Sequence, residues 1–139
     1  MSKVITSVVA GIIVKEDLIL IAQRSNKVDH PLKWEFPGGK LLPNESINQA
    51  LIREFKEELS IEIKKSYFLM EYIYEYKYLK KVHLSFFKID DYLGKIANNI
   101  HSKIIWTNVI DIKSYDFLDG DIKIIENIVN ADILGLKSK

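Results

Sequence analysis

The stretch GKLLPNESINQALIREFKEELSI, residues 39–61, combines a helical pattern with a run of carboxylates. Apolar residues recur every four positions, which is the stripe of a helix that buries one face: Ile47, Leu51, Phe55 and Leu59. Ser46 is followed three residues later by Gln49, which is a capping-box pattern. We therefore expect the helix to begin near Ile47.

Three glutamates of this helix, Glu54, Glu57 and Glu58, have the spacing i, i+3 and i+4. Their side chains should leave the helix within about one turn, where like charges repel one another. A divalent cation would remove this repulsion, and Mg²⁺ prefers oxygen ligands of this kind. A solvated acidic face is the alternative interpretation of the same pattern.

The spacing around these glutamates, G-x₅-E-x₇-R-E-U-x-E-E with U apolar, favours a functional site. Its members are Gly39, Glu45, Arg53, Glu54, Phe55, Glu57 and Glu58. At average residue frequencies, chance agreement is on the order of one in 10⁸ per starting position. The pattern resembles the Nudix box of the Nudix hydrolases, pyrophosphohydrolases that act on a nucleoside diphosphate linked to another group. Ser60 stands where that family usually has glycine, so the helix exit should differ or be strained by up to about 1 kcal/mol.

The resemblance implies roles for the matching residues. The Gly39 carbonyl and the three helix glutamates would hold Mg²⁺, or Mn²⁺ in its place. Arg53 would orient these carboxylates by pairing with Glu45, which gives a catalytic set of Arg53, Glu54, Glu57 and Glu58. The general base stays open between Glu57 and Glu58.

Composition indicates one globular domain over residues 1–139, since 47% of the residues are hydrophobic and 28% are charged. A net charge of +1 gives no reason to expect binding to a nucleic-acid polymer or to an anionic membrane. The chain has no cysteine, which excludes a disulfide framework and a thiol nucleophile and fits a cytoplasmic protein. The apolar run Val4–Val14 lacks a signal-peptide cleavage site and is interpreted as a buried strand. The oligomeric state is left open.

The remaining chain predicts strands before and after the acidic helix. We expect strands at residues 4–14, 18–22, 64–78 and 82–89, a short strand at Trp34, a buried strand at residues 104–106 and a final helix over about 121–133. A turn is predicted at Lys80 and Lys81, and residues 90–102 are predicted to be irregular. This order favours a mixed sheet between helices. The resemblance implies the Nudix fold, an α/β/α sandwich with a mixed β-sheet.

The resemblance to the MutT-like branch extends upstream, through Gln23 and Arg24 and through residues 34–40. The residues expected to contact a nucleotide substrate are Arg24, Glu35, Gly38, Gly39, Lys40 and Asp121. Arg24 is alternatively a solvated strand end. Asp121 falls where the MutT-like and CTP pyrophosphohydrolase patterns place a polar residue that reads the base; alternatively, it caps the last helix.

The chain departs from the MutT branch in the loop before the tryptophan strand. That branch often supplies a further carboxylate there, whereas residues 98–102 read NNIHS. His101 is either a base or metal contact, or a solvent-facing loop histidine.

The resemblance implies a metal-dependent enzyme that hydrolyses nucleoside triphosphates to the monophosphate and pyrophosphate, with oxidised dGTP and CTP-like pyrimidines as candidates. A dinucleoside polyphosphate hydrolase and a non-catalytic nucleotide sensor are the alternatives.

Overall fold

The computed structural model describes residues 5–136, apart from the side chain of Leu79. Its strands are β1 (Ile5–Lys15), β2 (Leu18–Gln23), β3 (Trp34–Glu35), β4 (Gly38–Lys40), β5 (Glu62–Tyr76), β6 (Lys80–Leu93) and β7 (Lys103–Thr107). The helices are α1 (Ile47–Leu59) and α2 (Ile122–Asn130), with short 3₁₀ turns at Lys77–Leu79, Ile112–Ser114 and Asp119–Asp121. Within this described part, neither helix is long and apolar enough to cross a membrane.

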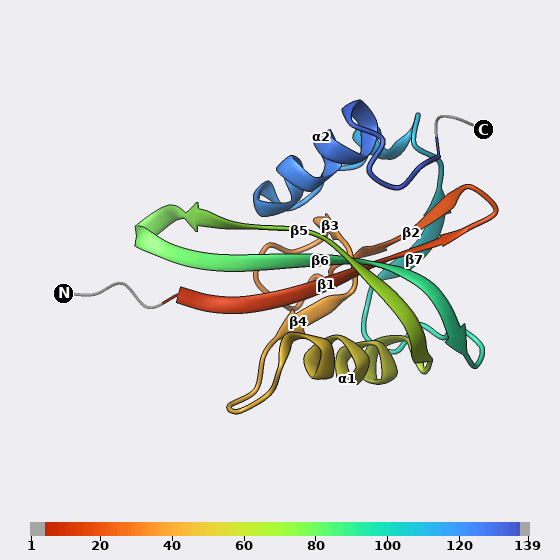
Figure 1. Ribbon diagram of the computed structural model, residues 1–139. Coiled ribbons are helices and arrows are strands. Elements are labelled where there is room, and N and C mark those ends of the chain that lie inside the picture. Colours follow the sequence, from red (N-terminus) through yellow and green to blue (C-terminus); the bar gives the residue numbers. More distant parts are fainter. Residues whose placement is uncertain (1–4, 137–139) are drawn as a thin grey trace.

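The strands form one mixed sheet with the order β3-β2-β1-β6-β5. Strands β1 and β6 are parallel, and the other pairs are antiparallel, with β4 added to β1 and β7 added to β2. Figure 1 shows α1 on one side of the sheet and α2 on the other. The expected α/β/α sandwich with a mixed sheet is therefore confirmed.

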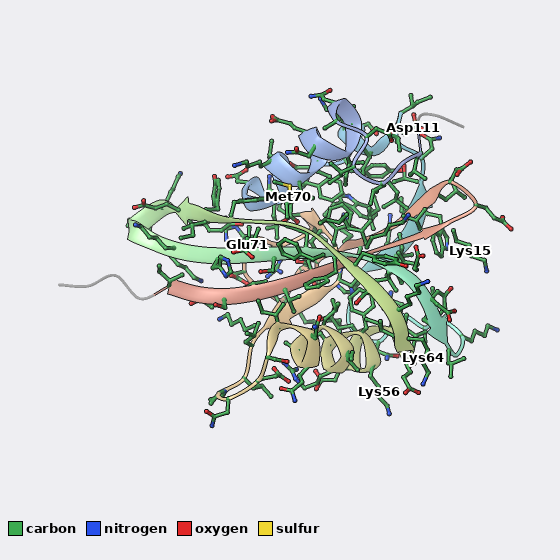
Figure 2. All side chains as sticks on the ribbon, in the orientation of Figure 1. Lys15, Lys56, Lys64, Met70, Glu71 and Asp111 are labelled. Atoms are coloured by element: carbon green, nitrogen blue, oxygen red, sulfur yellow. The ribbon has the colours of Figure 1, made fainter. Side chains whose placement is uncertain are left out.

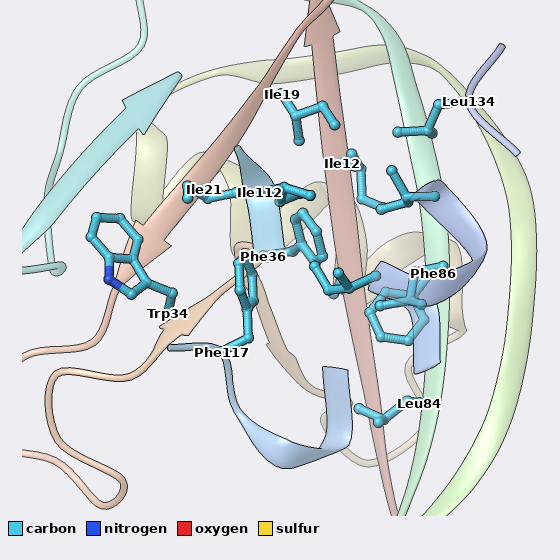
Figure 3. Close-up of a cluster of buried hydrophobic side chains, with 14 of the residues drawn as sticks. Ile12, Ile19, Ile21, Trp34, Phe36, Leu84, Phe86, Ile112, Phe117 and Leu134 are labelled. Atoms are coloured by element: carbon cyan, nitrogen blue, oxygen red, sulfur yellow. The ribbon is translucent and has the colours of Figure 1, made fainter. Parts of the chain in front are cut away.

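Each face of the sheet has its own apolar core. On the α2 side, Phe36 packs edge-on against Phe86 and tilted against Phe117 (Figure 3). On the α1 side, Phe55 and Leu51 are fully buried against the sheet. Gly11 of β1 permits this contact, because a Cβ atom there would lie 2.5 Å from the Phe55 ring.

The outer surfaces carry the charges. Lys56 points away from the sheet on α1, and Lys64 points outward from β5, whereas Met70 lies between β5 and α2 (Figure 2). Burial on one face and exposure on the other explains why α1 has the amphipathic pattern of its sequence.

Several predicted boundaries are wrong. The turn between β5 and β6 lies at Lys77–Leu79, and β6 begins at Lys80 and continues to Leu93 through part of the segment predicted to be irregular. Pairing with the long edge strand β5 holds these extra residues extended. Helix α2 ends at Asn130, not Ile133. The strand at residues 104–106 was predicted to be buried, but Trp106 of β7 is 37% exposed, because β7 pairs with β2 outside the main strand order. Val4 lies outside the described residues.

Candidate active site

The start of α1 is fixed by the expected capping box. Gln49 N–H donates to Ser46 Oγ at 3.1 Å, and Ser46 N–H donates to Gln49 Oε1 at 2.9 Å. The helix therefore begins at Ile47, as predicted. This start also fixes which glutamates of the following turns face the sheet.

Arg53 ties the helix to the preceding loop. Its Nε and Nη2 donate to the two carboxylate oxygens of Glu45 at 2.7 and 2.9 Å, and its Nη1 donates to Glu54 Oε1 at 2.7 Å. Nη2 also donates to the Lys40 carbonyl at 3.0 Å. The bidentate Arg53–Glu45 contact has the expected pairing, and the Arg53 hydrogen bonds lower the pKa of Glu45 to about 2.

Glu54 and Glu58 approach each other at the end of β4. The Glu58 side chain is only 5% exposed. The pKa of Glu58 is raised, mainly by burial and to a smaller extent by the hydrogen-bonded Glu54 carboxyl group. Its Oε1 atom is buried without a hydrogen-bond partner within the described residues. Gly39 lies against this pair, since a Cβ on it would be 2.6–2.8 Å from the Glu54 carboxylate.

These observations fit a divalent cation. Two adjoining carboxyl groups, one with a buried oxygen that lacks a hydrogen-bond partner, cost free energy in the absence of a positive charge. A bound cation removes that cost. The glycine brings backbone to the same place, so Gly39, Glu54 and Glu58 lie together, and their role as cation ligands stays a prediction.

Glu57 is placed differently from the other two glutamates. Its side chain is 59% exposed and contacts Arg53 Nη1 at 3.3 Å. Within residues 5–136, no three histidine, cysteine, aspartate or glutamate side chains are gathered as a ready ligand set. The cation-binding role of Glu57 therefore stays a prediction, and it requires movement of that side chain away from Arg53.

A pocket of about 300 Å³ opens beside Glu58. The predicted substrate contacts Arg24, Glu35, Gly38, Gly39, Lys40 and Asp121 all line it. Apolar walls come from β1 and β6, including Val8 and Leu84. A pocket of this size with a few converging polar groups is typical of a small-ligand site.

Asp121 lines the same pocket from the turn before α2. It occupies the N-cap position but makes no capping hydrogen bond with its side chain, so the capping alternative is wrong. The side chain is buried and accepts a hydrogen bond from the Phe36 backbone. Burial, followed by the charge of Glu35, raises the pKa of Asp121 well above its usual range.

Two tyrosines of β5 hold the turn that carries Asp121. Tyr72 Oη donates to the Gly120 carbonyl at 2.6 Å, and Gly120 N–H donates to Tyr76 Oη at 3.1 Å. Tyr76 also lines the pocket and contacts the His30 ring, with 5.4 Å between ring centroids. The sequence pattern did not distinguish Tyr76 from the other aromatic residues of β5, and it did not point to His30. The β5 alternation that places Tyr72 and Tyr76 on one face was the available signal.

Arg24 is not a solvated strand end. Its Nη1 donates to Glu35 Oε1 at 2.8 Å, and its Nη2 donates to Asp29 Oδ1 at 2.6 Å. Burial alone would lower the pKa of Arg24, but the two carboxylates outweigh it and the pKa is raised. Arg24 thus joins the loop after β2 to the pocket wall.

His101 is not solvent-facing either. Its side chain is 2% exposed, and Nε2 lies 3.0 Å from Glu35 Oε2 and 3.7 Å from Glu58 Oε1. The interpretation as a solvent-facing loop histidine is therefore wrong. A single histidine in a polar loop gives no sequence signal of this burial, because the burial arises from packing against α1 and β3.

Comparison with known proteins agrees with this geometry. The profile of the NUDIX domain matches residues 5–128. The chain is 34% identical over 119 residues to the CTP pyrophosphohydrolase of Escherichia coli strain K12, covering 86% of this chain and 87% of that protein. It is 33% identical over 123 residues to the 8-oxo-dGTP diphosphatase of Buchnera aphidicola subsp. Schizaphis graminum, covering 88% and 92% respectively. The solution structure of the E. coli ORF135 protein superposes with a TM-score of 0.81 at 32% identity, covering 93% of this chain and 94% of that one.

The pocket and the paired glutamates beside it thus lie in an α/β/α sandwich with the same fold as the superposed structure. This chain belongs to the Nudix family. It is a Nudix pyrophosphohydrolase, as the resemblance of residues 39–61 to the Nudix box implied.

Proposed function

We propose that this protein hydrolyses nucleoside triphosphates in a divalent-cation-dependent reaction that releases the monophosphate and pyrophosphate. One observation carries the proposal. A single pocket extends from Glu58 and Gly39 at the end of β4 to Asp121 and Tyr76 near α2. The first end suits phosphates with a cation, and the second offers polar and aromatic contacts to a base.

Gly39, Glu54 and Glu58 would hold Mg²⁺ or Mn²⁺, with Glu57 as a further ligand after leaving Arg53. When bound, the cation would neutralise charge on the phosphate oxygens and make a bound water more acidic. Arg53 keeps Glu54 in place through the Nη1 hydrogen bond, while Glu45 anchors Arg53. Lys40, at the pocket wall, places positive charge near the phosphates.

The chemistry of the base end supports an amine-bearing base. Asp121 and Glu35 are carboxyl groups, and a carboxyl oxygen accepts hydrogen bonds from an exocyclic amine or a ring N–H in both the ionised form and the protonated form that burial favours for Asp121. The two relatives bear the names CTP pyrophosphohydrolase and 8-oxo-dGTP diphosphatase, and both bases carry such groups. We therefore propose CTP-like pyrimidine nucleotides or oxidised dGTP as substrates. We also propose a cytoplasmic location, which a chain without cysteine fits.

A substrate screen tests this proposal. Canonical, oxidised and methylated nucleoside triphosphates and dinucleoside polyphosphates would be incubated with Mg²⁺ or Mn²⁺, and the products separated by ion-exchange chromatography. We expect equal amounts of monophosphate and pyrophosphate from a cytosine or oxidised guanine nucleotide. Release of orthophosphate, or turnover of dinucleoside polyphosphates alone, would contradict the proposal.

A further inference from the structure

The loop between β6 and β7 is fastened to the end of α1. Ala97 N–H donates to the Leu59 carbonyl at 2.9 Å, and Asn99 N–H donates to the Glu58 carbonyl at 3.1 Å. The Asn99 side chain adds a bond to the Glu57 carbonyl at 2.9 Å. The loop therefore satisfies carbonyls at the helix end that have no partner within the helix.

The same loop holds His101 in one orientation. Asn98 Nδ2 donates to the His101 carbonyl and His101 N–H donates to Asn98 Oδ1, both at 2.9 Å. Ser102 N–H then donates to the Gln23 carbonyl of β2 at 2.9 Å. The histidine backbone is thus fixed relative to both α1 and the sheet.

The His101 ring lies between two carboxylates of the pocket wall. Nε2 has two oxygen neighbours, at 3.0 Å in Glu35 and at 3.7 Å in Glu58, so we assign the ring proton to this nitrogen, which then donates to Glu35. The other oxygen of Glu35 accepts from Arg24. Glu35 is consequently held from two sides, and His101 supplies the side nearer to the helix glutamates.

His101 is absent from the pocket lining, whereas Glu35 and Glu58 are part of it. The His101 ring therefore meets the pocket wall through these two carboxylates. Its Nδ1 is a buried nitrogen without a hydrogen-bond partner within the described residues. A buried nitrogen without a hydrogen-bond partner costs free energy, so packing alone does not account for a histidine at this position.

We propose that His101 is a positioning residue that holds the Glu35 carboxylate at the pocket wall and thereby sets the binding of the nucleotide base. The inference rests on the proposed function in taking the Asp121 and Glu35 end as the base-binding end. It assigns to His101 neither the attack of water nor contact with the substrate.

Two substitutions of His101 separate positioning from packing. His101→Gln places an amide N–H near the position of Nε2, whereas His101→Leu fills the space without a donor. His83→Leu is the matched control, because His83 pairs with Glu71 outside the pocket. The affinity for the nucleoside monophosphate would be measured by calorimetry without metal, together with kcat, KM and the melting temperature.

We expect His101→Leu to weaken monophosphate binding and to raise KM by about tenfold or more, with a smaller change in kcat, because a hydrogen bond to a charged group is lost. His101→Gln should stay within about threefold of wild type, as should His83→Leu. In a Glu35→Ala background, His101→Leu should add little further loss, because the carboxylate that His101 contacts is already absent.

Three results would overturn the inference. Unchanged monophosphate affinity in His101→Leu would show that the histidine does not act on the pocket. Equal losses of monophosphate affinity in His101→Leu and His101→Gln, in proportion to a fall in melting temperature, would show that His101 serves packing. A changed Mn²⁺ affinity with normal monophosphate affinity would place its action on Glu58. The monophosphate titration measures binding and needs no turnover. An inactive wild-type protein would therefore contradict the proposed function, and the titration would still test the positioning role of His101.

Discussion

The Asn99 side-chain amide donates a hydrogen bond to Ser60 Oγ at 2.9 Å, at the residue where Nudix proteins usually have glycine. Ser60 has left-handed backbone angles, φ 61° and ψ 29°, so the strain expected from the sequence is present. The serine side chain compensates by linking the helix end to the β6–β7 loop. The departure from the usual glycine thus has a local structural reason.

We expect Ser60→Gly to change the free energy of unfolding by less than about 1 kcal/mol, because relief of backbone strain offsets the lost hydrogen bond. Urea denaturation would measure this change. Asn99→Ala should destabilise the wild-type chain more than the Ser60→Gly chain, since the Ser60 bond is absent in the latter. A large gain in stability from Ser60→Gly would show that the Asn99 contact contributes nothing.

Glu45 should make part of the stability dependent on pH. Its pKa is lowered from 4.5 to about 2, first by the Arg53 hydrogen bonds and then by the Leu42 backbone. A lowered carboxylate pKa stabilises the fold above the unfolded-state value and loses this effect as pH falls through the folded-state value. The melting temperature of Glu45→Gln should therefore lie below that of wild type near pH 6, and the difference should shrink between about pH 4.5 and pH 2. Glu16→Gln, in an exposed hairpin turn, is the control, and a constant difference across this range would contradict the linkage.

Glu58 should show the opposite behaviour without metal. Its pKa is raised first by burial and then by Glu54, so its ionisation destabilises the fold as pH rises above the unfolded-state value of about 4.5. We expect Glu58→Gln to raise the metal-free free energy of unfolding at neutral pH by ~1 kcal/mol. Mg²⁺ at a concentration a hundred times its dissociation constant should raise the free energy of unfolding of the wild-type chain by about 3 kcal/mol. The same concentration should stabilise Glu58→Gln much less. Scanning calorimetry with Mg²⁺ and with a chelator checks both effects.

Glu57→Gln is the matched comparison for Glu58→Gln. Glu57 is exposed, so its substitution should leave metal-free stability within about 0.5 kcal/mol of wild type. Hydrolysis should nevertheless be abolished if Glu57 acts with the cation. Unchanged turnover of Glu57→Gln at saturating metal and substrate would remove Glu57 from the mechanism.

Sequence patterns predicted the helix and its carboxylates because their signals are local. Ser46 and Gln49 define the helix start over three residues, and the periodic apolar face defines its length. Contacts between segments distant in sequence were not accessible in this way. His101 meets Glu35 across 66 residues, and no local pattern indicates that a loop histidine will be buried.

The same distinction explains the errors at strand ends. Pairing with β5 extends β6 beyond what its composition indicated, because a partner strand satisfies backbone groups regardless of side chain. Strand β5 keeps its predicted length but begins and ends two residues earlier. Glu57, by contrast, contacts Arg53 in the structure. Its contact with a cation stays a prediction, because no cation-bound conformation of the side chain follows from the sequence pattern.

Substrate choice should depend on Asp121, because Glu54 and Glu58 lie at the end of the pocket that we propose for the phosphates and would not contact the base. Asp121 is buried, is not used as a helix cap and lines the pocket. Asp121→Ala should therefore reduce kcat/KM about ten- to a hundredfold on cytosine and guanine nucleotides, which carry amines. The kcat/KM of Asp121→Ala on uracil and thymine nucleotides should change by less than about threefold, so the preference for amine-bearing bases becomes smaller. Asp119→Ala, an exposed neighbour in the same turn, should leave both classes unchanged. Steady-state kinetics on the four bases checks this selectivity, and an equal loss on all of them would assign Asp121 to supporting the turn before α2 instead of reading the base.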